Sequence, residues 1–289
     1  MSRTNFDQLL QAGCHFGHLK RKWNPAMAPY IFMERNGIHI IDLNKTVAKI
    51  DDAAEALKAI AKAGKKILFV ATKKQAKEIV AEKAASVNMP YVNERWAGGT
   101  LTNFPTIRKA VKKMTNIDKL MNDGTFANLS KRELLQVTRQ RAKLEKNLGS
   151  ISDLTRLPNA LFIVDVMKEH IAVKEANRLG IPVFGIVDTN SDPSNIDFVI
   201  PANDDATKSI ELIVGTVCQA IHEGLQESKA RDKEEDERNH AAEEGAGEDN
   251  PRRDRRAKSN ARRSRRDDEA RPTAEAEASA AEGQATSEE

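Results

Sequence analysis

The segment GCHFGH near the start of the chain holds the residues most suggestive of catalysis. His15 and His18 stand three residues apart beside Cys14, and a thiolate next to an imidazole can act as a nucleophile. Such a pair needs a third group that orients the histidine, and the sequence offers no obvious one. The segment also precedes the first strand of the predicted core. A structural or RNA-contact role is therefore favoured over catalysis, and we predict no catalytic site.

A phosphate site is a second possibility, at the end of the apolar run KILFVA. Thr72, Lys73 and Lys74 follow it where a strand passes into a helix, so side chains and free N–H groups could hold a phosphate. Neither the dinucleotide fingerprint nor the P-loop is present, because TKKQ replaces a glycine-rich loop. The phosphate could belong to a nucleotide or to an RNA backbone.

Three aspartates could instead bind a divalent ion. Asp188 ends a predicted strand in IVDTNSDP, and Asp204 and Asp205 open a later helix. Carboxylates are good ligands for such ions. However, turn formation and helix capping explain aspartates at these places at least as often. The three residues are therefore weak metal candidates only, and we predict no cofactor.

Two short segments place basic residues next to a tryptophan. Lys20, Arg21 and Lys22 precede Trp23, and Arg95 precedes Trp96. Cations beside exposed aromatic rings suit phosphate contact combined with stacking on unpaired bases. Either tryptophan alone would more often be a core residue. Together with a basic hairpin and a basic block in the tail, the two segments favour RNA binding.

The elements that must position these residues alternate along the chain. Short apolar runs predict five strands, at 38–43, 66–71, 160–165, 181–188 and 197–201. Helical segments lie between most of them, and a final helix runs from Asp204 or Asp205 to about Leu225. Strand and helix in alternation predict a parallel sheet covered by helices, which is a doubly wound α/β core. We assign residues 1–102 and 151–225 to this core.

Residues 103–150 interrupt the alternation. Apolar residues recur there at three- and four-residue steps, and Ser130 with Glu133 forms a capping-box pattern between two helical stretches. An antiparallel helical hairpin inserted into the core is the simplest interpretation. Its exposed faces carry many basic and few acidic residues, so phosphate contact is favoured over plain solvation. The hairpin residues chosen as RNA-binding candidates are Arg108, Lys109, Lys112 and Lys113.

Composition divides the chain at about residue 225. The 289 residues have a formal net charge of +3, but residues 226–289 contain no large apolar residue and are predicted to be disordered. This tail holds 14 basic and 19 acidic residues, whereas residues 1–225 hold 32 basic and 24 acidic ones. The tail includes PRRDRRAKSNARRSRR, which is either a solvated linker or a nucleic-acid-binding arm.

The remaining composition excludes several classes of protein. Two cysteines cannot form a disulfide framework, which makes a reducing compartment the default. No apolar stretch approaches the roughly 20 residues that cross a bilayer, and the N-terminus is not a secretory signal. Membrane, secreted and fibrous proteins are therefore excluded.

Four long strings resemble one family, the bacterial small-subunit ribosomal protein number two. They occur in the order of that family and span about Phe6 to Gly224, and they read GCHFGHLKRKWNPAMAPYIFMERNGIHIIDLNKT, KILFVATKKQA, NERWAGGTLTNFPTI and EANRLGIPVFGIVDTNSDPSNIDFVIPANDDA. The resemblance implies a flavodoxin-like parallel sheet of about five strands with a protruding helical hairpin. The tail is longer than is usual in that family, and its charges are grouped more strongly into acidic and basic blocks. The role of the tail therefore cannot be taken from the family.

The resemblance also implies a function. Members of this family contact ribosomal RNA and neighbouring proteins in the small subunit, and they help to dock the OB-fold ribosomal protein one during initiation. No enzymatic activity, cofactor, membrane association or homo-oligomer is implied, and the expected location is the bacterial ribosome in the cytoplasm. RNA-facing positions are implied in Lys20–Trp23, Lys73–Lys74, Arg95–Trp96 and the hairpin. Two alternatives stay open, an enzyme or nucleotide sensor on the same core and a scaffold whose hairpin binds protein.

Overall fold

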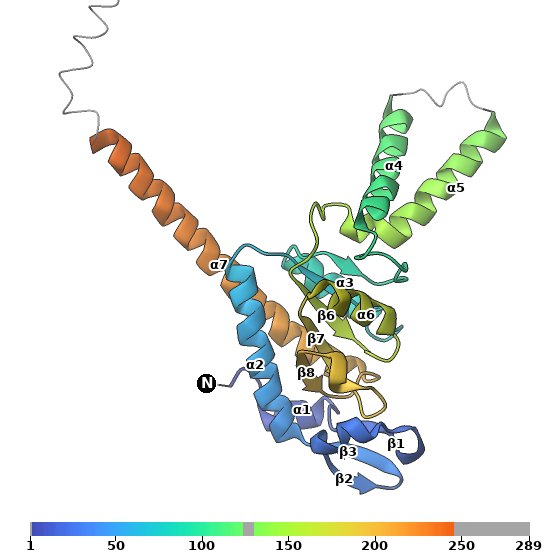
Figure 1. Cartoon of the computed structure of the whole chain (residues 1–289), viewed down its shortest axis with the longest axis vertical. Coiled ribbons are helices and arrows are strands. Elements are labelled where there is room, and N and C mark those ends of the chain that lie inside the picture. The colour runs from blue at the N-terminus through green and yellow to red at the C-terminus, as the bar shows by residue number, and fades with distance from the viewer. Residues whose placement is uncertain (1, 124–129, 246–289) are drawn as a thin grey trace, which may run out of the picture. The chain divides into compact units, whose positions relative to one another are not determined.

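The computed structural model describes residues 2–123 and 130–245 (Figure 1). Met1–Arg231 form one compact unit that includes the hairpin, and Asp232–Glu289 form a second. The basic block of the tail lies outside the described residues, so both interpretations of it stay open.

The central sheet has five parallel strands in the order β5-β4-β6-β7-β8. All residues of β4, β6 and β7 are buried, as expected for strands covered on both faces. The strand order corresponds to the flavodoxin-like order, so the predicted fold class is confirmed. The strands comprise β4 (Ile67–Val70), β5 (Tyr91–Val92), β6 (Ala160–Val164), β7 (Val183–Val187) and β8 (Phe198–Pro201).

A row of phenylalanines shows how the sheet is packed. Phe69, Phe162, Phe184 and Phe198 are direct neighbours across four strands. The ring centroids of Phe69 and Phe162 are 5.3 Å apart, and those of Phe184 and Phe198 are 4.3 Å apart and stacked. This row faces a layer formed by α1 (Phe6–Gln11), α2 (Leu43–Lys62), α3 (Lys77–Ser86) and α7 (Thr207–Gly245). The other face is covered by α6 (His170–Leu179) and the base of the hairpin.

A second, antiparallel sheet was not predicted. It contains β1 (Phe16–Leu19), β3 (Ile38–Ile41) and β2 (Ile31–Arg35) in the order β1-β3-β2. The strand expected at 38–43 therefore exists, but its assignment to the parallel core was wrong. The fifth parallel strand is instead β5, whose two residues are too few to give a hydrophobic pattern. Alternation of apolar and polar residues indicates a strand, but it does not show which strands pair with it.

The hairpin is confirmed and lies between β5 and β6 in the chain. It consists of α4 (Phe104–Asn122) and α5 (Lys131–Leu148), and α5 begins at the predicted capping box of Ser130 and Glu133. Arg141 of α5 donates a hydrogen bond to Asp118 of α4 at 2.7 Å. Among the described residues, short 3₁₀ segments connect these elements: η1 (Lys20–Lys22), η2 (Pro25–Tyr30), η4 (Gly149–Ile151) and η5 (Pro193–Asn195).

The last helix extends further than predicted. We expected it to end at about Leu225 with a disordered tail from residue 226, whereas α7 continues to Gly245. The extension lacks large apolar residues but is rich in Glu, Lys, Arg and Ala, which have high helix propensity. The prediction was wrong here because low hydrophobicity argues against a packed core, not against a solvated helix.

The two ends of the compact unit are tied together. The guanidinium of Arg3 contacts both carboxylate oxygens of Glu223 in α7, at 3.0 and 2.7 Å. The hydroxyl of Thr46 in α2 donates to the carbonyl of Pro201 in β8 at 2.6 Å. The N-terminal helices thus rest on the last strand and the last helix.

Two expectations about composition can be compared with the structure. No helix in the described ranges is both long and apolar enough to cross a membrane. Cys14 and Cys218 are both buried free thiols. Burial raises the pKa of each thiol, and that of Cys218 reaches about 12, so neither is a ready nucleophile.

Candidate nucleic-acid interface

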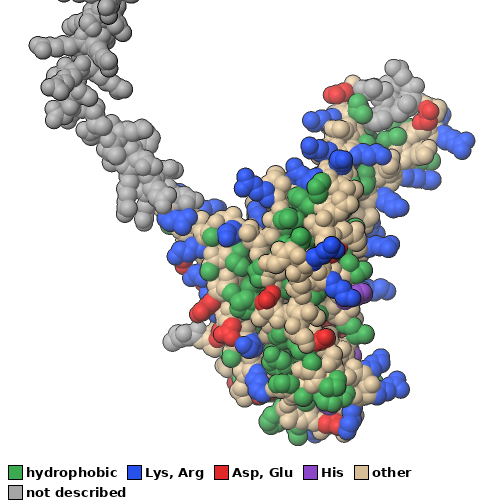
Figure 2. All heavy atoms as spheres, viewed as in Figure 1, with side chains coloured by type: hydrophobic (Ala, Val, Ile, Leu, Met, Phe, Trp, Pro, Cys, Tyr) green, Lys and Arg blue, Asp and Glu red, His purple; other side chains and the backbone are tan. Residues whose placement is uncertain are grey.

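One face of α4 presents three exposed lysines. Lys112 and Lys113 lie three and four residues after Lys109, so both share a side of the helix with it. The opposite side buries Val111 and Met114. In the part of the chain that the structure describes, no carboxylate lies within ion-pair distance of the three ammonium groups. Figure 2 shows Lys and Arg side chains standing along the hairpin. Their charges are free to meet an external anion.

Arg108 has a different place from the three lysines. It is half-buried, and its guanidinium donates to the carbonyl oxygen of Leu154 at 2.8 Å. This bond ties the first turns of α4 to the segment that follows α5. Arg108 therefore holds the base of the hairpin in addition to carrying charge.

The loop that leads into α4 is organised by a buried carboxylate. Glu175 of α6 is 8% exposed and accepts five hydrogen bonds from residues 96–102. The donors are the indole Nε1 of Trp96 (3.1 Å), the N–H groups of Gly99 (2.7 Å), Leu101 (2.9 Å) and Thr102 (3.1 Å), and the hydroxyl of Thr102 (3.1 Å). Burial alone would raise the pKa of Glu175, but these hydrogen bonds outweigh it and hold the pKa below its usual value.

The same contacts correct one predicted site residue. Trp96 was expected to stack on RNA bases, but it is only 7% exposed and packs in the core beside Leu101. Its indole N–H is already taken by Glu175. Arg95, by contrast, is exposed and lines a hollow with Ile107 and Lys143 of the two hairpin helices. Of this predicted pair, Arg95 is exposed to solvent and Trp96 is buried.

The first basic segment lies at the small sheet. Arg21 and Lys22 are exposed in η1, while Lys20 forms an ion pair with Glu34 of β2 at 2.7 Å. Trp23 is half-buried, and its ring packs against His39 with centroids 5.0 Å apart. This segment lies on the small sheet, whereas the three lysines belong to the hairpin.

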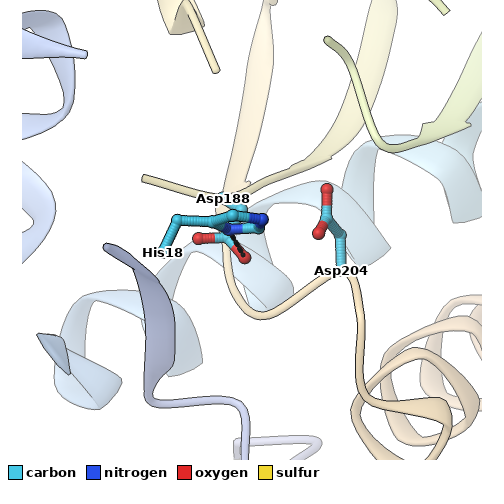
Figure 3. A group of neighbouring side chains, drawn as sticks. All are labelled: His18, Asp188 and Asp204. Carbon is cyan, nitrogen blue, oxygen red and sulfur yellow. Dashed lines mark ion pairs between the residues drawn. The ribbon is translucent and has the colours of Figure 1, made fainter. Parts of the chain in front are cut away.

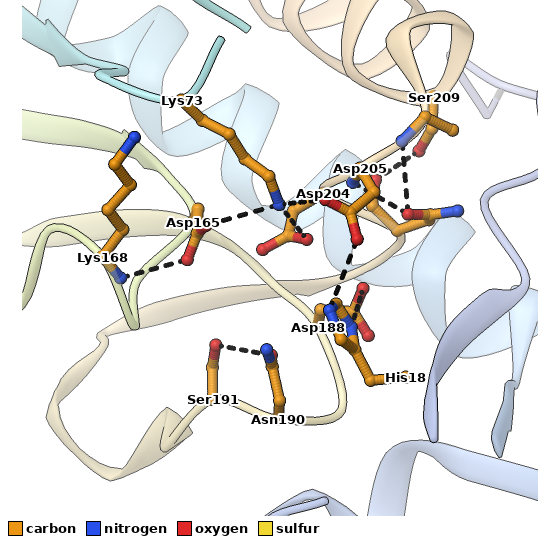
Figure 4. Close-up of polar contacts among 12 residues, drawn as sticks. His18, Lys73, Asp165, Lys168, Asp188, Asn190, Ser191, Asp204, Asp205 and Ser209 are labelled. Atoms are coloured by element: carbon orange, nitrogen blue, oxygen red, sulfur yellow. Dashed lines mark hydrogen bonds and ion pairs between the residues drawn. The ribbon is translucent and has the colours of Figure 1, made fainter. Parts of the chain in front are cut away.

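Lys73, a candidate phosphate contact, already has partners within the chain. Its ammonium contacts three carboxylates where the parallel strands end, from Asp165 (3.4 Å), Asp204 (2.8 Å) and Asp205 (2.6 Å) (Figure 4). Such an edge repels phosphate. The adjacent Lys74 is exposed and remains a candidate.

The predicted aspartates do come together at this edge. Asp188 and Asp204 are fully buried, and His18 of β1 lies between Asp188 (Nδ1 to Oδ2, 3.0 Å) and Asp205 (Nε2 to Oδ2, 3.3 Å). Burial, with the charges of Asp188 and Asp165, raises the pKa of Asp204 to about 7. The Asp188 carboxylate raises the pKa of His18 although burial opposes it. Burial lowers the pKa of Lys73, but the neighbouring aspartates have the larger effect, and the pKa is raised overall.

The sequence analysis did not identify Glu175 and Asp165 as organising residues. It singled out His18 but not its contacts with Asp188 and Asp205. A signal for Glu175 did exist, since it is an acid among the buried residues Ala172, Val173 and Ala176 of an amphipathic helix. Asp165 directly follows a buried strand, in the same position as Asp188. Carboxyl ends of parallel strands meet at one edge, so the topology alone brings these residues together.

The fold and its surfaces define a class of protein. At the ligand edge of the α/β core three aspartates hold the ammonium of Lys73, and basic side chains project from the hairpin (Figure 2). These features are typical of a protein that binds a polyanion.

Comparison with known proteins gives the family. Residues 9–224 match the family model described as "Ribosomal protein S2", so the chain belongs to the ribosomal protein S2 family. The chain is 78% identical over 247 residues to "Small ribosomal subunit protein uS2" of Phocaeicola vulgatus, covering 86% of this chain and 88% of that protein. Proteins of the same name match from Bacteroides fragilis (82% over 230 residues, 80% and 83% covered) and Parabacteroides distasonis (72% over 265 residues, 92% of each). The family is one of structural ribosomal components and not of enzymes, which confirms the resemblance seen in the sequence.

Proposed function

We propose that this chain binds ribosomal RNA of the small subunit through the exposed basic face of the hairpin, in the cytoplasm of a bacterium. The observation that carries the proposal is the contrast between the lysines. Lys73 is neutralised by three aspartates, whereas Lys109, Lys112 and Lys113 have no carboxylate partner in the described ranges. Free cations on a rigid helix can replace the counterions of an RNA backbone.

The rest of the basic surface supports the same role. Arg95 and Lys74 are exposed, as are Arg21 and Lys22 beside the small sheet. The capping box of α5 and the Arg141–Asp118 contact stiffen the hairpin, so its lysines are presented without a large ordering cost on binding.

The experiment that tests this role is sedimentation of the tagged chain with small subunits in a sucrose gradient. We expect co-sedimentation at low salt and progressive release as KCl rises, because each phosphate contact that forms releases counterions. Sedimentation as free protein at low salt would contradict the proposal. Retention that does not depend on salt would favour docking to protein instead.

We further propose that the small sheet helps to dock the OB-fold ribosomal protein one and so supports initiation. Ile40 pairs with both Phe16 and Met33, which places these two side chains on one face of the sheet. They are 49% and 50% exposed, while the other face of β3 buries His39 and Ile41. An apolar outer face of this kind suits a protein partner better than a polynucleotide.

Replacing both Phe16 and Met33 with Ser should weaken binding of purified protein one at least tenfold, because the docking face would lose its apolar surface. Calorimetric titration with the full-length chain measures the affinity. The matched control is Leu120→Ser with Leu135→Ser, which removes exposed apolar side chains from the hairpin. Equal affinities for the wild type and the Phe16/Met33 variant would rule out this docking face.

A further inference from the structure

Three buried polar atoms that form no regular hydrogen bond meet at the carboxyl edge of the sheet, and two of them, His18 Nδ1 and Asp188 Oδ2, face each other at 3.0 Å. They are His18 Nδ1, Asp188 Oδ2 and Asp204 Oδ2, and together they make up three of the seven such atoms among the described residues. The three side chains offer ligand atoms that all lie within 4.8 Å of one another. Figure 3 shows them approaching from β1, the end of β7 and the loop after β8. Buried polar atoms are nearly always satisfied, so such a convergence indicates a missing partner.

The charge of the edge indicates the sign of that partner. Three carboxylates contact a single ammonium, that of Lys73, which reaches Asp204 only through Oδ1. A fourth carboxylate, that of Asp188, lies beside Asp204. The other oxygen of Asp204 has no donor, the Oδ2 of Asp188 faces only Nδ1 of His18, and both aspartates are fully buried. Buried anionic oxygens require a cation or a proton donor. The missing partner is therefore positive.

The histidine favours a metal ion as that cation. Asp205 Oδ2 lies 3.3 Å from Nε2 of His18 and can accept its proton, which leaves the lone pair of Nδ1 turned toward Asp188 Oδ2 at 3.0 Å. A lone pair facing a carboxylate oxygen at that distance is repulsive unless a metal ion lies between them or Nδ1 carries a proton. A carboxylate that fixes the tautomer of a metal-binding histidine is a common outer partner of zinc sites.

We propose that His18, Asp188 and Asp204 bind one divalent transition-metal ion, with Zn²⁺ as the best fit. An imidazole with two carboxylates suits zinc, whereas Mg²⁺ prefers an octahedron of oxygens. Tetrahedral zinc places its ligands about 3.3 Å apart, so small side-chain rotations close the site. A water molecule completes the fourth position.

The backbone holds His18 ready for this role. Gly17 packs so tightly that an added Cβ would lie 2.6 Å from Thr189 Cγ2, and the N–H of His18 donates to Thr189 Oγ1 at 2.8 Å. The ion would thus tie the small sheet to the end of β7 and to the loop before α7.

Titration of the chelator-treated, full-length protein with Co²⁺ and with Zn²⁺ tests the proposal. We expect one equivalent to bind, with visible Co²⁺ absorption that Zn²⁺ abolishes, a higher Tm with Zn²⁺, and no displacement by millimolar Mg²⁺. Asp188→Asn and His18→Gln should each weaken binding more than 100-fold, and Asp205→Asn by about 10- to 100-fold. His222→Gln, an exposed histidine of α7, is the matched control and should bind as the wild type does.

Two results would overturn the proposal. One is no Zn²⁺ binding tighter than millimolar by the wild type, which would leave His18 as an imidazolium paired with Asp188. The other is binding that survives both His18→Gln and Asp188→Asn. If these variants fail to fold, long-range ¹H–¹⁵N spectra of the wild type still decide. Zn²⁺ on Nδ1 shifts that nitrogen of His18 selectively, and an unchanged ring spectrum would refute the site.

Discussion

Glu175→Gln should destabilise the compact unit by about 2–5 kcal/mol in urea denaturation. Glutamine has nearly the same shape, but its amide carries one acceptor oxygen, and its NH₂ group would face donors of the 96–102 loop. At least two of the five donors would lose their acceptor in a buried site. Glu78→Gln changes an exposed acid of α3 and should leave the denaturation midpoint almost unchanged. A midpoint of Glu175→Gln equal to that of wild type would refute the organising role of this carboxylate.

The effect of Glu175→Gln should depend on pH in one direction. The pKa of Glu175 is lower in the folded state than its ordinary value of 4.5, so the ionised carboxylate contributes its full stabilisation above that value. The contribution is lost as the pH falls through the lower, folded-state pKa. The difference in stability between wild type and variant should therefore be constant near neutrality and shrink below about pH 4.5. A difference that grew on acidification would contradict this sign.

Reversing the charge of Lys109, Lys112 and Lys113 together to Glu should produce the largest loss of RNA affinity. If each lysine neutralises one phosphate, the slope of log affinity against log salt should become less steep by roughly 2 to 3. At low salt the affinity should fall at least 100-fold, because repulsion is added to the lost attraction. Filter binding to small-subunit ribosomal RNA over a range of KCl concentrations measures both quantities.

The control for this triple variant carries the same change of charge elsewhere. Lys65, Lys208 and Lys229 are exposed and lie outside the hairpin, so their reversal alters the net charge equally. We expect only a small, uniform loss for the control. Equal losses in the two variants would mean that overall charge, and not the hairpin face, governs binding. Unchanged RNA affinity in the hairpin variant would favour a protein-binding hairpin.

The layers of the fold could be predicted where burial produces a pattern of apolar residues in the sequence. The runs that became β4, β6, β7 and β8 are continuous and apolar, and the hairpin shows a clear helical period with a capping box at Ser130. The small sheet was not predictable, because β1 and β2 are short and mostly exposed. The length of α7 was missed because a solvated helix depends on propensity and not on an apolar stripe.

Site residues too could be predicted only where the local sequence determines their environment. The exposure of Lys109, Lys112 and Lys113 follows from their spacing against the apolar side of α4. The burial of Trp96 and the neutralisation of Lys73 depend on partners about 80 and 130 residues away in the chain, Glu175 and Asp204. A local pattern cannot contain such pairings. The metal candidates Asp188, Asp204 and Asp205 did converge, since parallel strands bring their ends to one edge.

The ties between Arg3 and Glu223 and between Thr46 and Pro201 have a consequence for biosynthesis. Translation is vectorial, so the first residues leave the exit tunnel long before the residues that complete their contacts. Until α7 has emerged, the apolar sides of α1 and α2, with Leu9, Ile50 and Leu57, lack part of the surface that buries them. Such long-range closure slows folding and prolongs the exposure of apolar surface. The nascent chain closes on itself only when nearly all of its folded part has been synthesised.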